Sequence, residues 1–439
     1  MKNITPIIFI LLMLSSSFAA ASCRLTAISQ TEDGRTAIIP FGKVNLNDTY
    51  LQPVGTLLAS VVVPPTNYTY GGANASSVLW ECDKSDLDSI YFLVATNGDD
   101  RVGGFYDIGN KDGMKDVYAT WFAYTGLKLT MSGVTLTRYW NKVPITSYAT
   151  TDNGKIQIRL QDIPPLLAEL YRVSSIPENS AASNYCAGRG TGGLGYATAT
   201  GINYSCTQPN AYIQLSGDSN VSFSFARDRT GQDSAYSFLF WGADNGFGYG
   251  MRAANSLYQN PTCVARNVTP VVLFPTMSVT QLEEGATTSA NFTVQVECNN
   301  SAVSGVNNYQ TAIGFQVSPG AYSAAQQLGL VNANGGVSYL VSDNYFSNEM
   351  AHGVGIKIKN SLNKEMLFVG QPGTVSLTTP GGNNAGWYPV LDGASYTNSN
   401  ASGYSTYNQT MTATLGKLPG QSVTAGKIYA TSYVLVKMQ

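Results

Sequence analysis

Polar and apolar residues alternate in short runs along most of the chain. Lys155–Leu160 alternates strictly, as do Val221–Phe225 and Asn291–Cys298. A period of two predicts half-buried strands at these places. Turn signals such as Asn153-Gly154 separate the runs. The best helix candidate is residues 164–173, where two prolines suit a helix start. The pattern as a whole predicts an all-β chain.

The N-terminal segment has the three parts of a secretory signal peptide. Met1-Lys2-Asn3 carries one positive charge, residues 7–14 are continuously apolar, and small residues follow to Ala21. A short apolar stretch between a basic start and a small-residue cleavage site is typical of such peptides, and it is too short to span a bilayer. We therefore expect residues 1–21 to be removed on export and the mature chain to begin near Ser22.

Composition narrows the function classes. Charged residues make up 12% of the chain, the net charge is −2, and there is a single histidine, His352. Nucleic-acid binding usually needs a basic stripe, which a chain of this charge does not offer. A lone histidine excludes His₂ and His₃ zinc sites. We expect no nucleic-acid partner, no metal and no cofactor.

The cysteines indicate a disulfide framework. In an oxidising compartment, an even number of widely spaced cysteines without a C-x-x-C motif predicts disulfides rather than metal ligands. The chain has six cysteines, which allow many pairings. Pairing of neighbours keeps each bridge inside one local unit, and we expect it here: Cys23–Cys82, Cys186–Cys206 and Cys263–Cys298.

A domain boundary is expected near residue 260. A block rich in glycine and aromatic residues ends at Gly250, residues 259–262 contain Gln-Asn-Pro-Thr, and a new pattern starts at Cys263. Four cysteines precede this point and two follow it. The pattern therefore predicts two β-sandwich domains, residues 22–258 and residues 259–439.

The C-terminal half resembles a known family. Cys263 is followed by an apolar run with prolines over residues 268–275, which suits an edge strand, and a second strand ends in Cys298. Gly426, the fourteenth residue from the end, starts an alternation that continues to the terminus. As a set, these features resemble the pilin domain of the two-domain tip adhesins of chaperone–usher fimbriae. That family prefers an aromatic residue at the penultimate position, where this chain has Met438, and methionine can fill the same hydrophobic position.

The resemblance implies an incomplete fold in the C-terminal half. The pilin domain is an immunoglobulin-like sandwich that lacks its last strand, and this leaves a hydrophobic groove that promotes aggregation. A periplasmic chaperone fills the groove, and during assembly at the outer-membrane usher a donor strand of the next fimbrial subunit replaces it. Such strand addition combines backbone hydrogen bonds with side-chain pockets. The resemblance places in this groove Gly426, Ile428, Ala430, Val434, Val436 and Met438, with the carboxylate of Gln439 anchored by basic residues of the chaperone.

The N-terminus indicates a position at the end of a fibre. A subunit that stacks needs an extended donor arm before its first core cysteine, whereas cleavage near Ala21 leaves about one residue before Cys23. Such a subunit accepts a strand but donates none. We therefore expect a protein exported through the periplasm to the fimbrial tip on the bacterial surface. The alternative interpretation is that Cys23 belongs to an ordinary first strand of an unrelated secreted domain.

The large N-terminal domain of a tip subunit is expected to bind a receptor, and the family implies a host glycan or glycoprotein. Amide, hydroxyl and aromatic side chains suit sugars, because rings stack on C–H faces while Asn and Asp hold hydroxyls. The candidate binding residues are Asn97, Asp99, Asp100, Arg101, Trp121, Tyr124 and Trp140.

These candidates also have structural interpretations. The polar loop from Asn97 to Arg101 is either a solvated turn or a sugar-binding loop, and its spacing does not fit an EF-hand calcium loop. Trp121 lies in a strand-like run, where a buried core position competes with a role as a stacking platform. Trp140 stands at a strand end before Pro144, and we expect it to be the more exposed of the two.

Two other functions compete with this interpretation. A secreted carbohydrate-active enzyme needs catalytic groups, but the chain has no G-x-S-x-G motif. Asp99 and Asp100 are adjacent, so on a strand they would point to opposite faces instead of forming a carboxylate pair. A structural fimbrial subunit usually has one domain and a donor arm. We therefore expect a fimbrial tip adhesin and not an enzyme.

Overall fold

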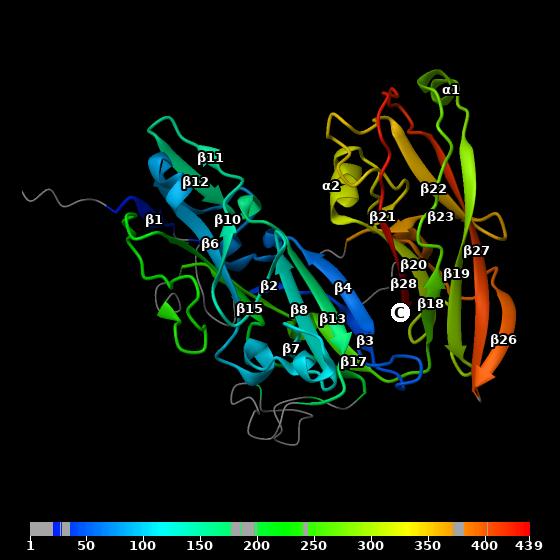
Figure 1. Ribbon diagram of the computed structural model, residues 1–439, viewed down its shortest axis with the longest axis horizontal. Coiled ribbons are helices and arrows are strands. Elements are labelled where there is room, and N and C mark those ends of the chain that lie inside the picture. Colours follow the sequence, from blue (N-terminus) through cyan, green and yellow to red (C-terminus); the bar gives the residue numbers. More distant parts are fainter. Residues whose placement is uncertain are drawn as a thin grey trace, which may run out of the picture.

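The protein is built mainly of β-strands (Figure 1). The computed structural model describes residues 21–26, 28, 36–176, 186, 197, 200–239, 245–371, 382–401 and 403–439. Residues 1–20 of the expected signal peptide therefore lie outside the described residues. Within the described ranges, no helix is both long enough and apolar enough to cross a membrane. The expected all-β class is confirmed.

The residues up to Tyr258 form four sheets in the described part of the chain. In spatial order, the first contains β1 (Cys23–Leu25), β5 (Val78–Asp83), β12 (Lys155–Arg159) and β11 (Ala149–Thr150). The second contains β10 (Asn141–Pro144), β6 (Ile90–Thr96), β15 (Ala211–Gly217), β16 (Phe247–Gly250) and β2 (Thr36–Ile38). The third contains β4 (Leu57–Val63), β13 (Leu166–Arg172), β8 (Thr125–Met131) and β7 (Tyr118–Ala119), with β9 (Val134–Thr135) beside β8. The fourth contains β14 (Ile202–Asn203), β17 (Asn255–Tyr258) and β3 (Gly42–Asn45).

Short helical turns connect these strands. They are η1 (Pro65–Asn67), η2 (Tyr70–Gly72), η3 (Lys84–Ser89), η4 (Arg101–Phe105), η5 (Ile108–Asp112), η6 (Leu160–Asp162) and η9 (Arg252–Ala254).

One hydrophobic core joins the four sheets. Trp80 of β5, Phe92 of β6 and Leu166 of β13 are all fully buried in it. The indole N–H of Trp80 donates to the side-chain oxygen of Asn245 at 2.9 Å. A large side chain is thus buried without losing the hydrogen bond of its one polar group.

Residues 164–173 do not form the expected helix, and this prediction is wrong. The strand β13 lies between β4 and β8 and pairs with both. Its side chains alternate, with Leu166, Ala168 and Leu170 buried in the core. The two prolines precede the first ladder residue, a position that strands tolerate. Packing in the sheet thus outweighs the local helix signal.

The residues from Cys263 onward form two further sheets. In spatial order, one contains β18 (Cys263–Val268), β19 (Thr288–Asn299), β27 (Tyr404–Lys417), β22 (Val354–Asn360) and β23 (Glu365–Met366), with β26 (Ser395–Ala401) beside β27. The other contains β21 (Gly336–Val337), β24 (Phe368–Val369), β20 (Thr311–Val317) and β25 (Trp387–Pro389), with β28 (Ser432–Met438) beside β20. The helices are α1 (Val279–Glu283) and α2 (Pro319–Gln327), with the turn η10 (Gly382–Ala385).

These two sheets face each other across a second hydrophobic core. It contains Val296 of β19 and Ile313 and Phe315 of β20, each at most 2% exposed. The rings of Phe292 and Phe315 meet edge to face, with centroids 5.7 Å apart. The C-terminal part is therefore a two-layer β-sandwich.

The three alternating runs have different outcomes. Two of them are strands as expected, in β12 and β19. Residues 221–225 are not a strand, and the prediction there is wrong: Phe223 makes only an isolated bridge, to Cys23. The rings of Phe223 and Phe225 instead pack edge to face at 5.3 Å. The alternation at this place reflects a local aromatic cluster and not a ladder.

Three disulfides join neighbouring cysteines, with the pairing expected from the sequence. One links β1 to β5, one links β18 to β19, and one closes a loop of the N-terminal part: Cys23–Cys82, Cys263–Cys298 and Cys186–Cys206. Bridges that close loops of this size stabilise a fold by roughly 3–4 kcal/mol each.

Side chains of the N-terminal and C-terminal parts contact each other. Arg266 of β18 forms an ion pair with Glu297 at 2.6 Å and donates to the backbone oxygens of Tyr50 and Leu51 at 2.8 and 3.2 Å. The hydroxyl of Tyr50 donates to Glu297 at 2.9 Å. In the described residues, however, no strand before residue 258 pairs with a strand after residue 263.

Lys437 of β28 lies at the same contact between the two parts. Its ammonium group donates to the backbone oxygen of Phe41 at 2.6 Å. Burial, together with the nearby charge of Lys43, lowers the pKa of Lys437 from its ordinary 10.5 to about 8. Burial disfavours the charged form of an amine, so the folded contact is more stable when Lys437 is neutral.

Asp343 fixes the segment that precedes β28. Its carboxylate accepts hydrogen bonds from the Ser318 hydroxyl at 2.7 Å and from the backbone N–H and hydroxyl of Thr431 at 2.9 and 2.6 Å. Ser318 is also the N-cap of α2, because its side chain accepts from the N–H of Ala321. One half-buried carboxylate thus joins the start of a helix to the start of the last strand.

Replacing Asp343 with alanine should destabilise the C-terminal part by about 1–3 kcal/mol, because Ser318 and Thr431 lose their acceptor. The measurement is chemical denaturation. Asp392→Ala is the control, since Asp392 only faces Lys364 at 3.8 Å on the surface and should cost less than about 1 kcal/mol. Equal effects of the two variants would contradict the role given to Asp343.

Replacing Lys437 with methionine should flatten the pH dependence of stability above pH 8. Between pH 8 and 10.5 the unfolded chain keeps a proton on Lys437 that the folded chain releases, so the free energy of unfolding of the native protein rises with pH in this window. Denaturation across this pH range measures the difference. Lys427→Met, at a site where the side chain is 75% exposed, should keep the native slope, and a Lys437→Met variant that also keeps it would refute the assignment.

Candidate functional site

Among the strands that the structure describes, the last one, β28, has a hydrogen-bonded neighbour on one side only. β20 pairs with it along its whole length. The backbone N–H of Gln439 donates to Gln310 at 2.8 Å, and that of Ser318 donates to Thr431 at 3.2 Å. In an antiparallel ladder, the backbone groups of the odd-numbered residues of β28 therefore point toward β20. Those of the even-numbered residues point to an edge where no described strand pairs with them: Ser432, Val434, Val436 and Met438.

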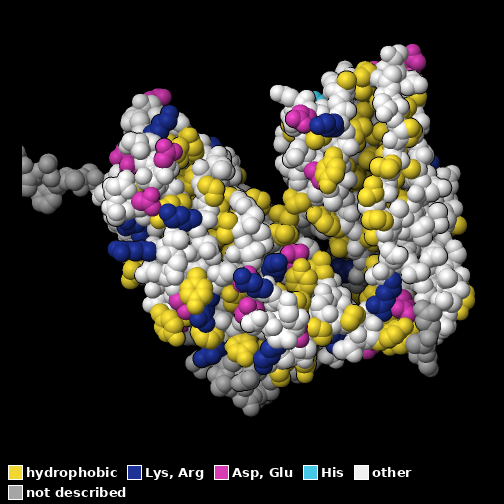
Figure 2. Space-filling view, viewed as in Figure 1, with side chains coloured by type: hydrophobic (Ala, Val, Ile, Leu, Met, Phe, Trp, Pro, Cys, Tyr) yellow, Lys and Arg dark blue, Asp and Glu magenta, His cyan; other side chains and the backbone are white. Residues whose placement is uncertain are grey.

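Apolar side chains lie half-exposed on this side of the sandwich. They pack against the C-terminal core and form what we call the apolar strip: Val268, Val272, Phe274, Met277, Ala430, Val434 and Val436. β18 lies beside β28 without a ladder between them. Figure 2 shows hydrophobic side chains in a band along this half of the molecule. A contiguous apolar band on a protein surface marks a site of protein contact.

The expected edge strand over residues 268–275 is not formed beyond its first residue, because β18 ends at Val268. The side chains that follow still alternate. Val272 and Phe274 pack against the core, whereas Val271 and Leu273 are 65% and 80% exposed. The prolines of this run lack the N–H that a ladder needs. The segment keeps the side-chain pattern of a strand without a partner strand.

The expected terminal strand from Gly426 is shorter, since β28 begins only at Ser432. Before it, the chain runs along a loop, and the backbone N–H of Lys427 donates to Glu349 at 2.9 Å. A Cβ at Gly426 would lie 2.4 Å from the backbone of Met350, so this close approach requires glycine. Three of the residues expected in the groove therefore precede the strand: Gly426, Ile428 and Ala430.

Apart from Gly426 and Ile428, the residues expected in the groove fall into two groups. Ala430, Val434 and Val436 belong to the apolar strip. Met438 and Gln439 are 1% and 6% exposed, so they are covered in this structure. The open part of the edge is thus shorter than the resemblance implies and lies before Met438.

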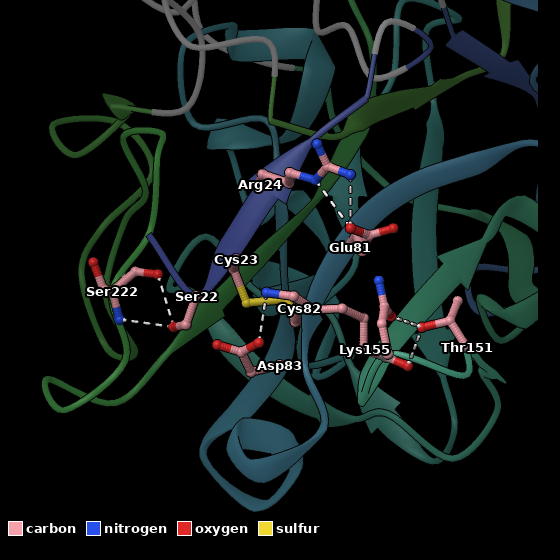
Figure 3. Close-up of polar contacts among 10 residues, drawn as sticks. Ser22, Cys23, Arg24, Glu81, Cys82, Asp83, Thr151, Lys155 and Ser222 are labelled. Atoms are coloured by element: carbon pink, nitrogen blue, oxygen red, sulfur yellow. Dashed lines mark hydrogen bonds and ion pairs between the residues drawn. A yellow bond between two sulfur atoms is a disulfide. The ribbon is translucent and has the colours of Figure 1, made fainter. Parts of the chain in front are cut away.

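The start of the described chain is part of a sheet (Figure 3). The hydroxyl of Ser22 donates to the backbone oxygen of Ser222 at 3.0 Å, and the backbone oxygen of Ser22 accepts from Asp83 at 2.8 Å. The next residue, Cys23, is bridged to Cys82. The chain is therefore fixed to its neighbours from Ser22 onward.

The polar loop singled out in the N-terminal part is mainly internal. Asn97 and Asp100 are 0% and 1% exposed, and Asp99 is exposed. The carboxylate of Asp100 accepts from the N–H of Val102 at 2.9 Å, and the amide of Asn97 donates to the backbone oxygen of Pro209 at 2.9 Å. The interpretation as a solvated turn is therefore wrong for Asn97 and Asp100, which hold the turn η4 in place.

Of the three aromatic candidates, only Tyr124 is at the surface. Trp121 and Trp140 are both 0% exposed, so the expectation that Trp140 is accessible is wrong. Their indole N–H groups donate to the backbone oxygens of Cys186 at 3.2 Å and Ser237 at 3.0 Å. Buried indoles with satisfied donors are core residues. Tyr124 is 41% exposed and has a left-handed backbone, with φ of 59°.

An open cleft of about 820 Å³ lies beside the turns η4 and η5. We call it the Arg138 cleft. It is lined by Phe105, Tyr106, Asp107, Asn110, Lys111, Lys115, Asp116, Tyr118, Thr137, Arg138 and Tyr139. The seven candidate residues are not among these, although Arg101 reaches its border, with the guanidinium 4.3 Å from the centroid of the Phe105 ring.

Arg138 is held firmly at the wall of this cleft. Its guanidinium forms an ion pair with Asp233 at 2.8 Å and lies 4.5 Å from the centroid of the Phe105 ring. Burial acts to lower the pKa of Arg138, but the ion pair with Asp233 outweighs it, so the pKa is raised overall. Since Arg101 lies over the same ring, Phe105 is occupied by cations of the protein itself.

Two further groups of the cleft are also used within the protein. The carboxylate of Asp107 accepts from the backbone N–H groups of Asp116 and Val117, both at 3.2 Å, and burial raises its pKa. The hydroxyl of Tyr118 accepts from the N–H of Arg138 at 3.1 Å, and burial raises its pKa to about 12. These contacts shape the cleft and leave other side chains for a ligand.

Sequence reasoning missed most of the Arg138 cleft. It pointed to the polar loop from Asn97 to Arg101, which ends at the border of the cleft, but not to residues 105–118 or 137–139. The segments that contain residues 105–118 and 137–139 meet beside β8. Residues 118–119 pair with the first half of β8, and residues 134–135 pair with its last two residues. A tyrosine beside a charged residue, as in Arg138-Tyr139, is the local signal, and it is a weak one.

A comparison with known protein families finds a match for the C-terminal part of the chain. Residues 252–439 match the family model described as "Fimbrial protein". No curated protein matches the chain.

Three solved structures are similar to parts of the chain at low identity. The P pilus rod subunit PapA is 17% identical over 40% of this chain and 99% of its own, with a TM-score of 0.24. A chaperone–usher pilus is 14% identical over 40% of this chain and 87% of its own, with a TM-score of 0.24. The CupB6 tip adhesin from Pseudomonas aeruginosa is 12% identical over 95% of both chains, with a TM-score of 0.23. At these TM-scores the structures carry no argument about this chain.

The family match covers both sheets of the C-terminal sandwich and the open edge of β28. Residues 252–439 are therefore similar to the fimbrial protein family, and the match is confined to this C-terminal part.

Proposed function

We propose that the protein is the adhesin at the tip of a chaperone–usher fimbria, joined to the fibre by a donor strand from the next subunit. In this proposal residues 22–258 form the receptor-binding domain and residues 259–439 the pilin domain. The observation that carries it is the open edge of β28 beside the apolar strip. An unpaired strand edge next to half-exposed core side chains is a template for an added strand.

The donor strand would complete the sandwich in two ways. Its backbone would pair with the outward N–H and C=O groups of Val434 and Val436, and its alternate side chains would cover the apolar strip. Burial of four or five apolar side chains at about 1.5–3 kcal/mol each gives on the order of 6–15 kcal/mol. A periplasmic chaperone would cover the same edge before assembly at the outer-membrane usher.

The N-terminus supports the position at the tip. If the chain is cleaved after Ala21, the mature protein starts with residues that are already fixed, because Ser22 bonds to Ser222 and Cys23 is bridged to Cys82. A subunit built in this way accepts a strand and has no extended arm to donate. It would therefore end a fibre on the bacterial surface.

The division into two domains is supported by the packing. The larger hydrophobic core contains residues before 258, and the core of the sandwich contains residues from Cys263 onward. The contacts between them include hydrogen bonds of Arg266 and Lys437 and a ring contact between Tyr50 and Tyr404, whose centroids lie 4.6 Å apart. The N-terminal domain would then present its surface to a host glycan or glycoprotein.

A synthetic peptide with alternating apolar residues should bind the open edge and stabilise the full-length protein. A gain of a few kcal/mol corresponds to a rise in melting temperature of about 10 °C, at roughly 2–4 °C per kcal/mol for a domain of this size. Thermal unfolding with and without the peptide measures this rise. The same peptide with aspartate at the alternate apolar positions is the control.

Two substitutions in β28 sharpen this test. Val434→Asp, in the apolar strip, should abolish the response to the peptide. Tyr433→Asp, on the outer face of the same strand, where the tyrosine is 51% exposed, should preserve it. A peptide-free protein that is monomeric, stable and unresponsive to the peptide would contradict strand acceptance.

The full-length protein, complemented with the peptide, should adhere to host cells through their carbohydrate. Periodate cleaves the vicinal diols of sugars, so oxidised cells should bind at least about tenfold less protein, a change of roughly 1.4 kcal/mol or more. Flow cytometry with labelled protein measures binding, and mock-treated cells are the control. Equal binding to both would show that the receptor is not a glycan.

A further inference from the structure

We infer that the Arg138 cleft is the receptor site of the N-terminal domain and that it binds a neutral saccharide. The inference rests on the proposed function, because it assigns the site and the ligand class of the proposed adhesin. A volume of about 820 Å³ is in the range of small-molecule sites on proteins. Its walls come from segments that the fold fixes at both ends, as the contacts of Asp107 and Arg138 indicate.

The aromatic side chains of the cleft differ in their availability. Phe105 is covered by two guanidinium groups, and Tyr118 is 7% exposed. Tyr139 is 50% exposed even though the guanidinium of Arg138 lies 5.7 Å from its ring centroid, and Tyr106 is half-buried. An exposed tyrosine ring at the rim of a cleft can stack on the C–H face of a pyranose, while its hydroxyl remains in water. Tyr139 is therefore the stacking platform of the site.

The charged groups of the cleft nearly balance. Lys111, Lys115, Arg138 and, at the border, Arg101 provide four positive charges, whereas Asp107, Asp116 and Asp233, the ion-pair partner of Arg138, provide three negative charges. A site with so small a net charge gives little electrostatic advantage to a carboxylated or sulfated ligand. It offers donors and acceptors side by side, which vicinal hydroxyl groups use together.

Asp116 and Asn110 are the side chains placed to hold sugar hydroxyls. Both line the cleft, Asn110 is exposed and Asp116 is half-exposed. Asp116 has a left-handed backbone, with φ of 60°, and its N–H is bonded to Asp107 at 3.2 Å. The backbone at Asp116 is thus fixed while its carboxylate stays available as an acceptor, which is the preorganisation that a binding site needs.

The experiment uses the full-length protein complemented with the donor peptide and a panel of neutral, sialylated and sulfated oligosaccharides. Tyr139→Asn removes the platform, and Asp116→Asn removes the charged acceptor with a residue that also suits a left-handed backbone. Each should weaken binding of the neutral ligand about tenfold or more. Tyr124→Asn is the matched control. Tyr124 is half-exposed, as Tyr139 is, it has a left-handed backbone, as Asp116 does, and it lies outside the cleft. This substitution should leave affinity unchanged.

Hydrogen exchange gives a second measurement that does not depend on the variants. Addition of the saccharide should slow exchange in residues 105–118 and 137–139, and the affinity should change little with ionic strength because the ligand is uncharged. Protection elsewhere, or unaffected binding by both cleft variants, would overturn the assignment of the site while leaving the adhesin proposal intact. Exclusive binding of sialylated or sulfated oligosaccharides would overturn the ligand class. Failure of the unmodified protein to bind any oligosaccharide would overturn both.

Discussion

The C-terminal sandwich depends on a strand edge that its own described residues leave unpaired. The carbonyl and N–H groups of Val434 and Val436 point away from β20, and no described strand meets them. Half-exposed side chains of the core lie along the same side. A sheet edge of this kind is normally shortened, charged or covered. Residues 252–439 match the fimbrial protein family model, and the proposed strand addition would turn this liability into a joint between subunits.

The open edge of β28, which is the proposed joint, lies close to the N-terminal part. Lys437, near the end of β28, bonds to the backbone of Phe41, and Arg266 of β18 bonds to the backbone of Tyr50 and Leu51. The strands that flank the open edge therefore also carry the contacts to the proposed receptor-binding domain. Polar contacts of this kind are common between domains that keep separate cores.

Alternation of polar and apolar residues predicts a strand correctly where a neighbouring strand pairs with that segment. The run in β19 was identified because each apolar side chain enters the core of the sandwich, and β13 was misassigned because its prolines imitate a helix start. The disulfide pairs followed from spacing alone, since each joins neighbours along the chain. In residues 221–225 the same alternation reflects aromatic packing, which periodicity cannot distinguish from a ladder.

The binding residues were harder to predict than the fold. Polar composition drew attention to Asn97 and Asp100, but these side chains are buried and hold a turn. Trp140 was expected at the surface and is a core residue. The Arg138 cleft instead joins two segments that meet only through the ladder of β8. A single sequence shows which residue types suit a sugar, but not which of them the fold leaves accessible.

Amide hydrogen exchange along β28 tests the central claim most directly. In the isolated protein the N–H groups of Val434 and Val436 should exchange fast, whereas those of Tyr433 and Leu435, which point to β20, should be protected. In the assembled fimbria all four should be protected, because a donor strand covers the open edge. Slow exchange at Val434 and Val436 in the isolated monomer would show that the edge is already closed and would contradict the account.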